Sequence, residues 1–298
     1  MPLAFPVASY DDALDALLDR ALAEDIGPGD VSALSTIPAD RQADAYFLLK
    51  EDGVVAGLAV AERVFAKVDP ELRVEWSASD GARLTAGTRF GTVEGPARSL
   101  LSAERLALNL MQRMSGIATA ARRMAEAAAP AKVLDTRKTV PGLRLLDKEA
   151  VRLGGAHNHR IGLYDMVMVK DNHIAAAGGL AEAVRATRRY LDAHGLDVPV
   201  EVETRTLEEV DELLAVAEEG RVDRVLLDNM ARRTPNGLDV SMLEAAVARI
   251  GGRLDTEASG NVTLETAHAI GATGVDFVSV GALTHSVRAL DISLKVSV

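Results

Sequence analysis

Five side chains that can carry positive charge lie between residues 133 and 173, each at or just beyond the end of a short apolar run. They are Arg137, Lys138, His159, Arg160 and Lys170. From Lys132 to His173 the chain has eight Lys or Arg against five Asp or Glu, a local charge of +3 in a protein of formal net charge −11. A low-dielectric cleft lined by one sign of charge concentrates the electric field against the global charge. The stretch predicts a pocket for a small polyanion; a solvated helical surface is the alternative.

Acidic and small residues further along the chain could complete such a pocket. Glu203 and Asp228 suit ribose hydroxyls or a hydrated Mg²⁺, because both prefer carboxylate oxygens. Small residues at the ends of later apolar runs would let backbone N–H groups approach a phosphate. These small residues are Ser259, Gly260, Asn261 and Gly281.

A regular alternation of strands and helices is expected to position these residues. After Pro130, apolar runs end in polar residues or glycine at intervals of 24 to 35 residues, at Asp135, Lys170, Glu203, Asp228, Glu257 and Gly281. Helical patterns lie between most of them, at 180–194, 207–218, 240–250 and 264–270. This period is typical of parallel βα units, and about six of them favour an α/β barrel with its functional residues at the C-terminal strand ends. An open doubly wound sheet would show the same alternation.

The first part of the chain has a different pattern. A helix is predicted over 10–25, short strands between 43 and 93 with a helix over 58–67, and a long helix from 98 to 128. This indicates an α+β domain rich in antiparallel pairing. On the long helix, Arg105, Asn109 and Gln112 share one polar stripe, which is either a solvated face or the wall of a ligand site.

Composition excludes several classes of function. The 298 residues are 48% hydrophobic, typical of a globular protein, and no apolar run reaches the length of a membrane span. The N-terminal residues show no targeting pattern, so we expect a cytoplasmic location. Without cysteine there is no thiolate metal site and no cysteine nucleophile. Only 3% aromatic residues and an acidic balance argue against nucleic-acid binding.

Two other readings concern single residues. Asn158, His159 and His173 could form a metal site, but no helical His pair is present and structural histidines are the preferred interpretation. Lys170 at a strand end could be a Schiff-base lysine of an aldolase, although anion binding explains the neighbouring cations equally well.

Several motifs together resemble the quinolinate phosphoribosyltransferase family of type II phosphoribosyltransferases. The resemblance extends from about Glu24 to Ile292, and its most specific blocks are TRK, NHR and KDNH in this order. The motifs are ERLALNLMQRMSGIAT, DTRKTVPGLR, GGAHNHRIGLYDMVMVKDNH, VEVE, LLDN, EASGN and VGALTHS. Asn261 departs from the pattern, since a second glycine commonly follows the serine.

The resemblance implies a fold and an assembly. The fold is α/β, an incomplete seven-stranded α/β barrel with an N-terminal α+β sandwich domain. We expect the sandwich domain over residues 1–115, the barrel over 116–285, and a C-terminal segment over 286–298 that returns to the N-terminal domain. The family forms homodimers with shared active sites, which in some members build into hexamers, so Arg105 would reach the partner's pocket.

The resemblance also implies a reaction and a set of site residues. Quinolinate and phosphoribosyl pyrophosphate would give nicotinate mononucleotide, pyrophosphate and CO₂ in NAD biosynthesis, with Mg²⁺ as cofactor. The quinolinate pocket would comprise Arg105, Thr136, Arg137, Lys138, His159, Arg160 and Lys170. Glu203 and Asp228 would lie near the ribose and Mg²⁺, and Ser259, Gly260, Asn261 and Gly281 would bind phosphate. Glu203 is preferred to Glu201 because it lies nearer the C-terminal end of the same strand.

The catalytic set would be Lys170, His159, Arg137, Glu203 and Asp228, with Lys170 or His159 protonating the carbanion left by decarboxylation. Three rival functions remain open at this point. They are a related phosphoribosyltransferase or molybdenum-transport-associated homologue acting on another aromatic acid, a Schiff-base aldolase using Lys170, and a non-catalytic sensor of an anionic metabolite.

Overall fold

The computed structural model describes residues 10–235 and 237–297. The first nine residues, where the sequence predicts no targeting signal, lie outside this part of the chain. The protein divides into two compact units. The parallel-sheet unit holds Arg123–Lys138 and Ala156–Ala282, and the antiparallel-sheet unit holds residues 10–122, Thr139–Gly155 and residues 283–297. The predicted domain boundaries at residues 115 and 285 stay a prediction.

The antiparallel-sheet unit is built on a four-stranded sheet in the order β14-β1-β5-β3. These strands are β1 (Gln42–Leu49), β3 (Arg73–Trp76), β5 (Arg89–Pro96) and β14 (Ile292–Ser297). Alternate residues of β1, including Phe47 and Leu49, are fully buried, as expected for a sheet with one face on a core. Phe47 packs on Phe65 and Phe90 with ring centroids 6.1 and 5.8 Å apart. The C-terminal strand β14 pairs with β1 from Asp44–Ser297 to Leu49–Ile292.

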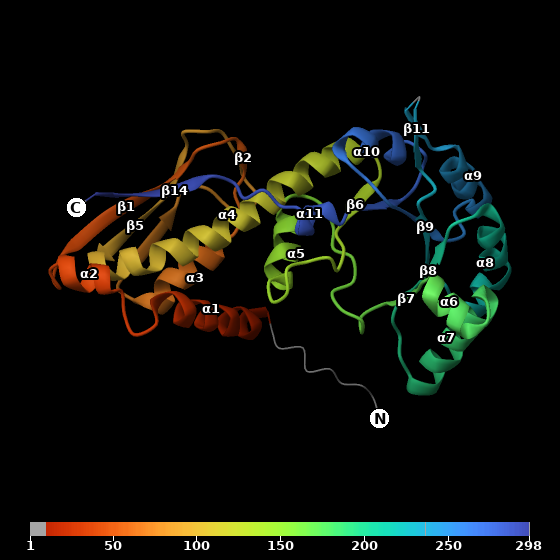
Figure 1. The fold of residues 1–298 in the computed structure, drawn as a ribbon, viewed down its shortest axis with the longest axis horizontal. Helices are drawn as coiled ribbons and strands as arrows, with labels where there is room; N and C mark the ends of the chain where they lie inside the picture. The colour runs from red at the N-terminus through yellow and green to blue at the C-terminus, as the bar shows by residue number, and fades with distance from the viewer. Residues whose placement is uncertain (1–9, 236, 298) are drawn as a thin grey trace. The chain divides into compact units, whose positions relative to one another are not determined.

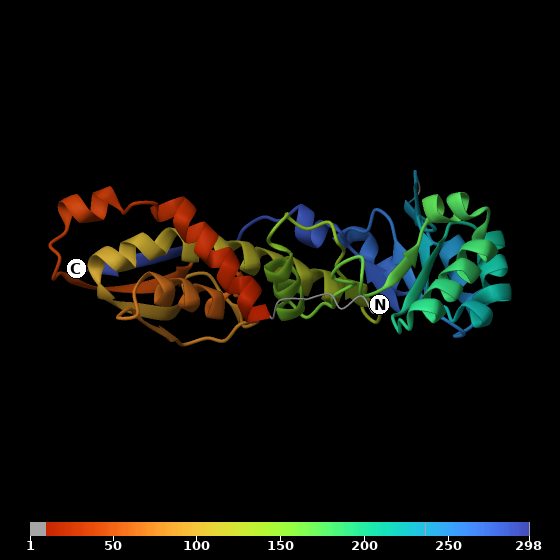
Figure 2. The same ribbon diagram turned by 90° about the horizontal axis from the view of Figure 1, so that it is seen from below.

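Helices cover the buried face of this sheet (Figure 1). The helices with residues in this unit are α1 (Tyr10–Ile26), α2 (Val31–Thr36), α3 (Leu58–Val68), α4 (Ala97–Ala128), α5 (Arg144–Leu153) and α11 (Ala282–His285). Two further strands of two residues each, β2 (Gly53–Val54) and β4 (Arg83–Leu84), pair with each other in a small separate sheet. Figure 2 shows α1 running past α3, to which it is joined by ion pairs from Arg63 and Lys67 to acids of α1. The helices predicted near 10–25, 58–67 and 98–128 are confirmed as α1, α3 and α4.

The parallel-sheet unit contains six strands, all parallel, in the order β6-β13-β12-β9-β8-β7. They are β6 (Lys132–Leu134), β7 (Val167–Val169), β8 (Val200–Thr204), β9 (Arg224–Asp228), β12 (Asp255–Ser259) and β13 (Phe277–Ser279). The crossover helices are α6 (Asp171–Ala177), α7 (Leu180–His194), α8 (Leu207–Gly220), α9 (Ser241–Ile250) and α10 (Leu264–Gly271), which Figure 1 shows outside the strands. The predicted βα alternation is confirmed, whereas the hairpin of β10 (Arg232–Thr234) and β11 (Gly237–Asp239) was not predicted.

The sheet curves as an incomplete barrel, which confirms the expected fold class. A seventh position is held by a single residue: His157 forms a parallel bridge with Leu134, on the free edge of β6. The ladder therefore runs from His157 to β7, and no backbone pairing between these two ends is present in the described residues. The residues from Asn158 to Met166 cross this opening, which we call the seam. Two predicted site residues, His159 and Arg160, lie in it.

Among the residues that the structure describes, no helix has both the length and the hydropathy to cross a membrane.

Candidate active site

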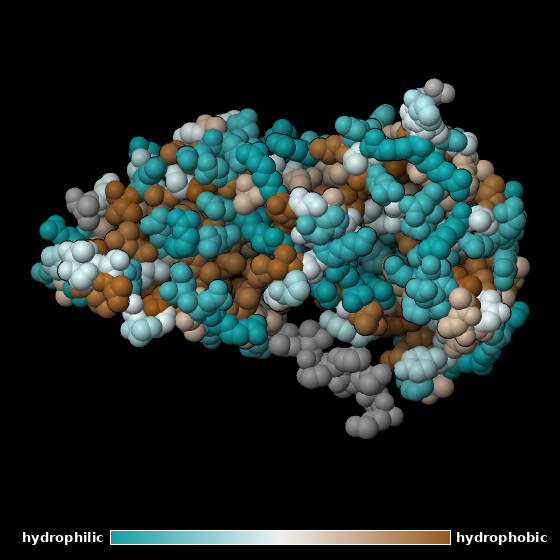
Figure 3. Space-filling model, in the orientation of Figure 1, coloured by the Kyte–Doolittle hydropathy of each residue, from teal (hydrophilic) through white to brown (hydrophobic). Residues whose placement is uncertain are grey.

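Three acidic side chains lie at the C-terminal ends of three neighbouring strands. Asp171 follows β7 as the first residue of α6, Glu203 lies near the end of β8, and Asp228 ends β9. Because β7, β8 and β9 are adjacent, the three carboxylates share one edge of the sheet. We call them the acidic cluster. Figure 3 shows mainly hydrophilic side chains over β8 and β9.

One arginine joins the acidic cluster. The Nη2 atom of Arg205 lies 2.9 Å from both Glu203 Oε1 and Asp171 Oδ2, and its Nε lies 3.5 Å from Asp228 Oδ2. Burial and the charge of Asp228 raise the pKa of Glu203, although nearby Lys170 and Arg205 oppose this shift. The sequence analysis identified Glu203 and Asp228 but missed Asp171 and Arg205. Their positions are the signal that could have identified them: Asp171 directly follows Lys170, and Arg205 lies two residues after Glu203.

The acidic cluster fits a hard divalent cation. It offers only carboxylate oxygens, the ligand type that Mg²⁺ prefers, and it presents them from separate rigid strand ends. The two residues predicted to hold the metal are sheltered from solvent, since Glu203 is 6% exposed and Asp228 is partly buried.

Lys170 lies at the border between the acidic cluster and the predicted anion pocket. Its Nζ is 4.0 Å from Glu203 Oε2, and its side chain is 46% exposed. Its backbone N–H donates to Nδ1 of His173, which thereby caps α6. His173 therefore has a structural role, in line with the preferred interpretation of the histidines, and Asn158 donates to Asp135.

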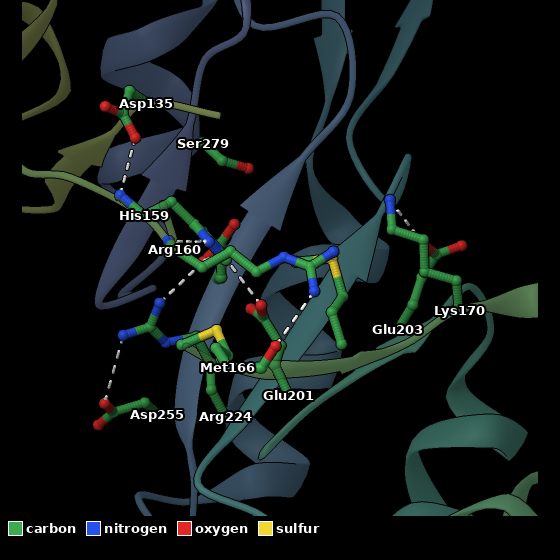
Figure 4. Close-up of polar contacts among 12 residues, drawn as sticks. Asp135, His159, Arg160, Met166, Lys170, Glu201, Glu203, Arg224, Asp255 and Ser279 are labelled. Atoms are coloured by element: carbon green, nitrogen blue, oxygen red, sulfur yellow. Dashed lines mark hydrogen bonds and ion pairs between the residues drawn. The ribbon is translucent and has the colours of Figure 1, made fainter. Parts of the chain in front are cut away.

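Two arginines lie at or near the seam, Arg160 within it and Arg137 three residues after the end of β6. Arg160 extends across it and donates from Nη1 to the Met166 carbonyl at 3.1 Å, with Nη2 3.7 Å from Met168 Sδ (Figure 4). Burial lowers the pKa of Arg160, and the charge of Arg137 lowers it further. The two positive charges thus repel each other. A bound dianion would remove this repulsion, because each guanidinium can bind a carboxylate through two N–H groups.

Thr136 and Lys138 lie beside Arg137, after the end of β6. The Lys138 N–H donates to Thr136 Oγ1 at 3.0 Å, which turns the chain just beyond the strand. The preceding residue, Asp135, is fully buried and accepts hydrogen bonds from the His159 N–H and the Asn158 side chain. The end of β6 and the seam are thereby fixed to each other.

The ring of His159 is held by a buried ionic network. Its Nε2 lies 3.0 Å from Glu201 Oε2 and 3.4 Å from Glu257 Oε2. Glu257 in turn binds Arg224 Nη1 at 3.1 Å, and the Arg224 guanidinium lies over the Phe277 ring. Figure 4 shows His159, Glu201 and Arg224 directed toward one another, with Lys170 and Glu203 to one side. Neither Glu201 nor Glu257 was predicted as a partner of His159.

This network could ligate a metal ion in principle, since one ligand atom from each of His159, Glu201 and Glu257 lies within 4.8 Å of the others. Hydrogen bonding and the Arg224 cation already account for the arrangement, because they neutralise the buried carboxylates. We therefore assign it to positioning His159.

The protonation of His159 follows from its two acidic neighbours. Burial alone would lower its pKa, but hydrogen bonds and charges from Glu201 and Glu257 raise it to about 9. The Arg160 N–H at 2.7 Å from Nδ1 instead favours an unprotonated Nδ1. That contact joins consecutive residues and follows from local chain geometry, whereas separate strands bring the carboxylates to Nε2. The carboxylates are the stronger indication, and we assign His159 a pKa above its ordinary value.

This assignment predicts a pH-dependent stability. Burial and the charge of Glu257 raise the pKa of Glu201 to about 7, so Glu201 and His159 both hold protons more tightly in the folded protein. Their contributions are fully present below the ordinary values of 4.5 and 6.5, and are lost as pH rises through about 7 and about 9. The free energy of unfolding of the wild-type protein should therefore receive a falling contribution from these two groups as pH rises from 6.5 to 9, measured by urea unfolding. A free energy of unfolding that does not fall over this range would contradict the raised pKa values.

The loop after β12 lies against the end of β9. Asn229 N–H donates to the Ser259 carbonyl at 2.9 Å, and a Cβ on Gly260 would meet Asn229 Oδ1 at 2.2 Å. Gly260 and Asn261 have φ of 106° and 52°. Asparagine tolerates the left-handed conformation, so Asn261 fits this position, where the resemblance led us to expect a second glycine. Gly281 lies two residues after β13, the strand next to β12. The predicted phosphate-binding residues therefore lie at the ends of two neighbouring strands.

Arg105 belongs to the antiparallel-sheet unit, where it is exposed on α4. Its proposed entry into a partner's pocket stays a prediction. Within the parallel-sheet unit, all the other predicted site residues lie at C-terminal strand ends or in the seam.

Comparison with known proteins gives one consistent result. Residues 30–115 match the family "Quinolinate phosphoribosyl transferase, N-terminal domain", and residues 117–295 match the corresponding C-terminal domain. A mitochondrial quinolinate phosphoribosyltransferase (decarboxylating) of Nicotiana glauca is 57% identical over 99% of this chain and 84% of its own length. A chloroplastic nicotinate-nucleotide pyrophosphorylase (carboxylating) of Arabidopsis thaliana is 58% identical over 97% of this chain and 83% of its own length.

Solved structures agree with the sequence matches. The crystal structure of NadC from Streptococcus pyogenes superposes with a TM-score of 0.86 and 39% identity, over 95% of this chain and 97% of that one. A nicotinate-nucleotide pyrophosphorylase from Francisella tularensis gives a TM-score of 0.87 and 37% identity, over 96% and 97% of the two chains.

Proposed function

This chain belongs to the quinolinate phosphoribosyltransferase family, and from this premise we propose that it converts quinolinate and phosphoribosyl pyrophosphate to nicotinate mononucleotide, pyrophosphate and CO₂. The enzyme is a pentosyltransferase of NAD biosynthesis. The observation that carries the proposal is the presence of two arginines, Arg137 just after the end of β6 and Arg160 in the seam, in the same parallel-sheet unit as the acidic cluster. A dicarboxylate and a ribose with its phosphates require these two kinds of site side by side.

The first step is displacement of pyrophosphate from C1 of the ribose by the pyridine nitrogen. Arg137 and Arg160 would hold the two carboxylates of quinolinate and orient that nitrogen toward the sugar. Positive charge grows on the ribose as the bond breaks, and Glu203 and Asp228 on the sugar side would stabilise it. Mg²⁺, held by these acids when bound, would offset the negative charge on the departing pyrophosphate.

The second step is loss of the 2-carboxylate. Once its nitrogen is ribosylated, the pyridine ring is cationic and accepts the electron pair left by CO₂, so the residues need only to orient it and to protonate C2. We propose Lys170, rather than His159, as the proton donor. His159 directs Nε2 to buried carboxylates, whereas the Lys170 ammonium is partly exposed at the strand ends.

Substrate comparison tests this function. With quinolinate, the purified protein should release pyrophosphate from phosphoribosyl pyrophosphate together with an equal amount of CO₂. With nicotinate, which has no 2-carboxylate to lose, it should release pyrophosphate far more slowly. Preference for nicotinate would indicate a related phosphoribosyltransferase. Trapping of a carbonyl substrate on Lys170 by borohydride would indicate an aldolase instead.

We propose a homodimer with shared sites, supported by the exposure of Arg105 on α4 and by family membership. If Arg105 serves the partner's pocket, mixing Arg105→Ala subunits with Lys170→Ala subunits should restore part of the activity, because one of the two mixed sites then has both residues. The measurement is turnover after subunit exchange, with exchange verified by mass. No recovery would contradict the shared site.

A cytoplasmic location stays a prediction, and fractionation of source cells would test it. The two plant relatives compared above carry the names of organelles.

A further inference from the structure

Arg205 occupies the centre of the acidic cluster. Its guanidinium contacts Glu203 and Asp171 at 2.9 Å each, and Asp228 at 3.5 Å, so it touches carboxylates from three neighbouring strand ends. The backbone of Arg205 is fixed separately, since its N–H donates to Glu209 Oε2 at 2.6 Å beside the start of α8. The main chain of Arg205 is thus held in place, while its guanidinium group contacts the three carboxylates of the acidic cluster.

The position of the head group matters because it is also the position suited to a divalent cation. A cation bound by oxygens of Glu203 and Asp228 needs the space between them, and Arg205 interacts with both. The two cations also compete electrostatically, since each neutralises the same carboxylates. Arg205 and a metal ion cannot both hold the cluster in this arrangement.

The guanidinium is free to leave without disturbing the core. Its side chain is 48% exposed, and exposed ion pairs are individually weak because water screens them. Once displaced, a guanidinium beside a phosphate-bearing substrate would gain bidentate hydrogen bonds to phosphate oxygens.

We propose that Arg205 is the counter-ion of the acidic cluster in the free enzyme. It is displaced only by a divalent cation that binds together with phosphoribosyl pyrophosphate. This inference rests on the proposed function, and it adds a positioning residue that couples metal binding to co-substrate binding. In the free enzyme Arg205 keeps affinity for the metal alone low. When the co-substrate is present, its phosphates hold the displaced guanidinium, so metal and co-substrate strengthen each other's binding.

The test is a titration with Mn²⁺ alone, followed by electron paramagnetic resonance and without any substrate. Arg205→Ala should bind Mn²⁺ at least about tenfold more tightly than wild type, because a competing charge has left the cluster. Arg205→Lys keeps a positive charge and should remain closer to wild type. Arg185→Ala is the matched control: this arginine is 43% exposed and pairs with Glu219 at 3.0 Å on the helical surface, so its removal should leave Mn²⁺ binding unchanged.

Two further measurements locate the effect and define failure. Adding Glu203→Gln to Arg205→Ala should abolish the gain in Mn²⁺ affinity. Phosphoribosyl pyrophosphate without quinolinate should tighten Mn²⁺ binding to wild type more than to Arg205→Ala. Unchanged or weaker Mn²⁺ binding by a folded Arg205→Ala would overturn the inference. Quinolinate turnover by wild type, measured separately, distinguishes this failure from failure of the proposed function.

Discussion

Replacement of Arg160 by alanine should lower kcat/KM for quinolinate by more than about tenfold, a loss of over about 1.4 kcal/mol of transition-state interaction. Arg160 places its guanidinium group in the seam, and its pKa is lowered by burial and by the charge of Arg137. A dianionic ligand would offset the repulsion between these two cations. Arg137→Ala should behave in the same way, with steady-state kinetics as the measurement.

The fold should survive both changes, because neither guanidinium belongs to the hydrophobic core. Arg160→Lys should recover only part of the activity, since an ammonium cannot bind a carboxylate in bidentate fashion. Arg189→Ala removes an arginine that is 63% exposed and pairs with Glu182 on the surface, and it should leave turnover unchanged. Near-normal kcat/KM in both Arg137→Ala and Arg160→Ala would remove these residues from the substrate pocket.

Replacement of Glu257 by alanine should destabilise the protein by about 3–5 kcal/mol, the usual effect of removing one partner of a buried ion pair. Glu257 is 1% exposed and interacts with both Arg224 and His159. Its removal takes a buried acidic partner from both residues, whereas the exposed Asp255, 4.0 Å from Arg224, and the buried Glu201, 3.0 Å from His159, remain. Urea unfolding measures the loss.

Asp255→Ala provides the matched control, because Asp255 pairs with the same arginine but its side chain is 58% exposed. Its removal should change the free energy of unfolding by less than about 1 kcal/mol. Equal effects of the two substitutions would show that burial does not determine the strength of this network.

The fold was largely predictable because its signals are local. The pattern over 180–194 places Leu180, Val184 and Leu191 on one face, and α7 buries that face. The alternation of strands and helices could not show whether the sheet closes into a barrel, because open and closed parallel sheets have the same alternation. The single-residue bridge at His157 and the open seam depend on contacts with β6, which no local pattern reveals.

The candidate site was predictable in position but not in its internal pairing. Lys170, Glu203 and Asp228 each end an apolar run, so the topology alone brings them to one edge. The partners of His159 could not be found in this way. Glu201 and Glu257 lie 42 and 98 residues further along the chain, and only the curvature of the sheet brings their carboxylates to one imidazole. Arg205 was missed because it follows the strand end and reaches back over it.

A crystal structure with bound quinolinate is the most direct test of the account. The two carboxylates of quinolinate should lie against the guanidinium groups of Arg137 and Arg160, with the pyridine nitrogen turned toward Glu203 and Asp228. Quinolinate bound elsewhere in the molecule, with these two arginines unengaged, would contradict the assignment of the site.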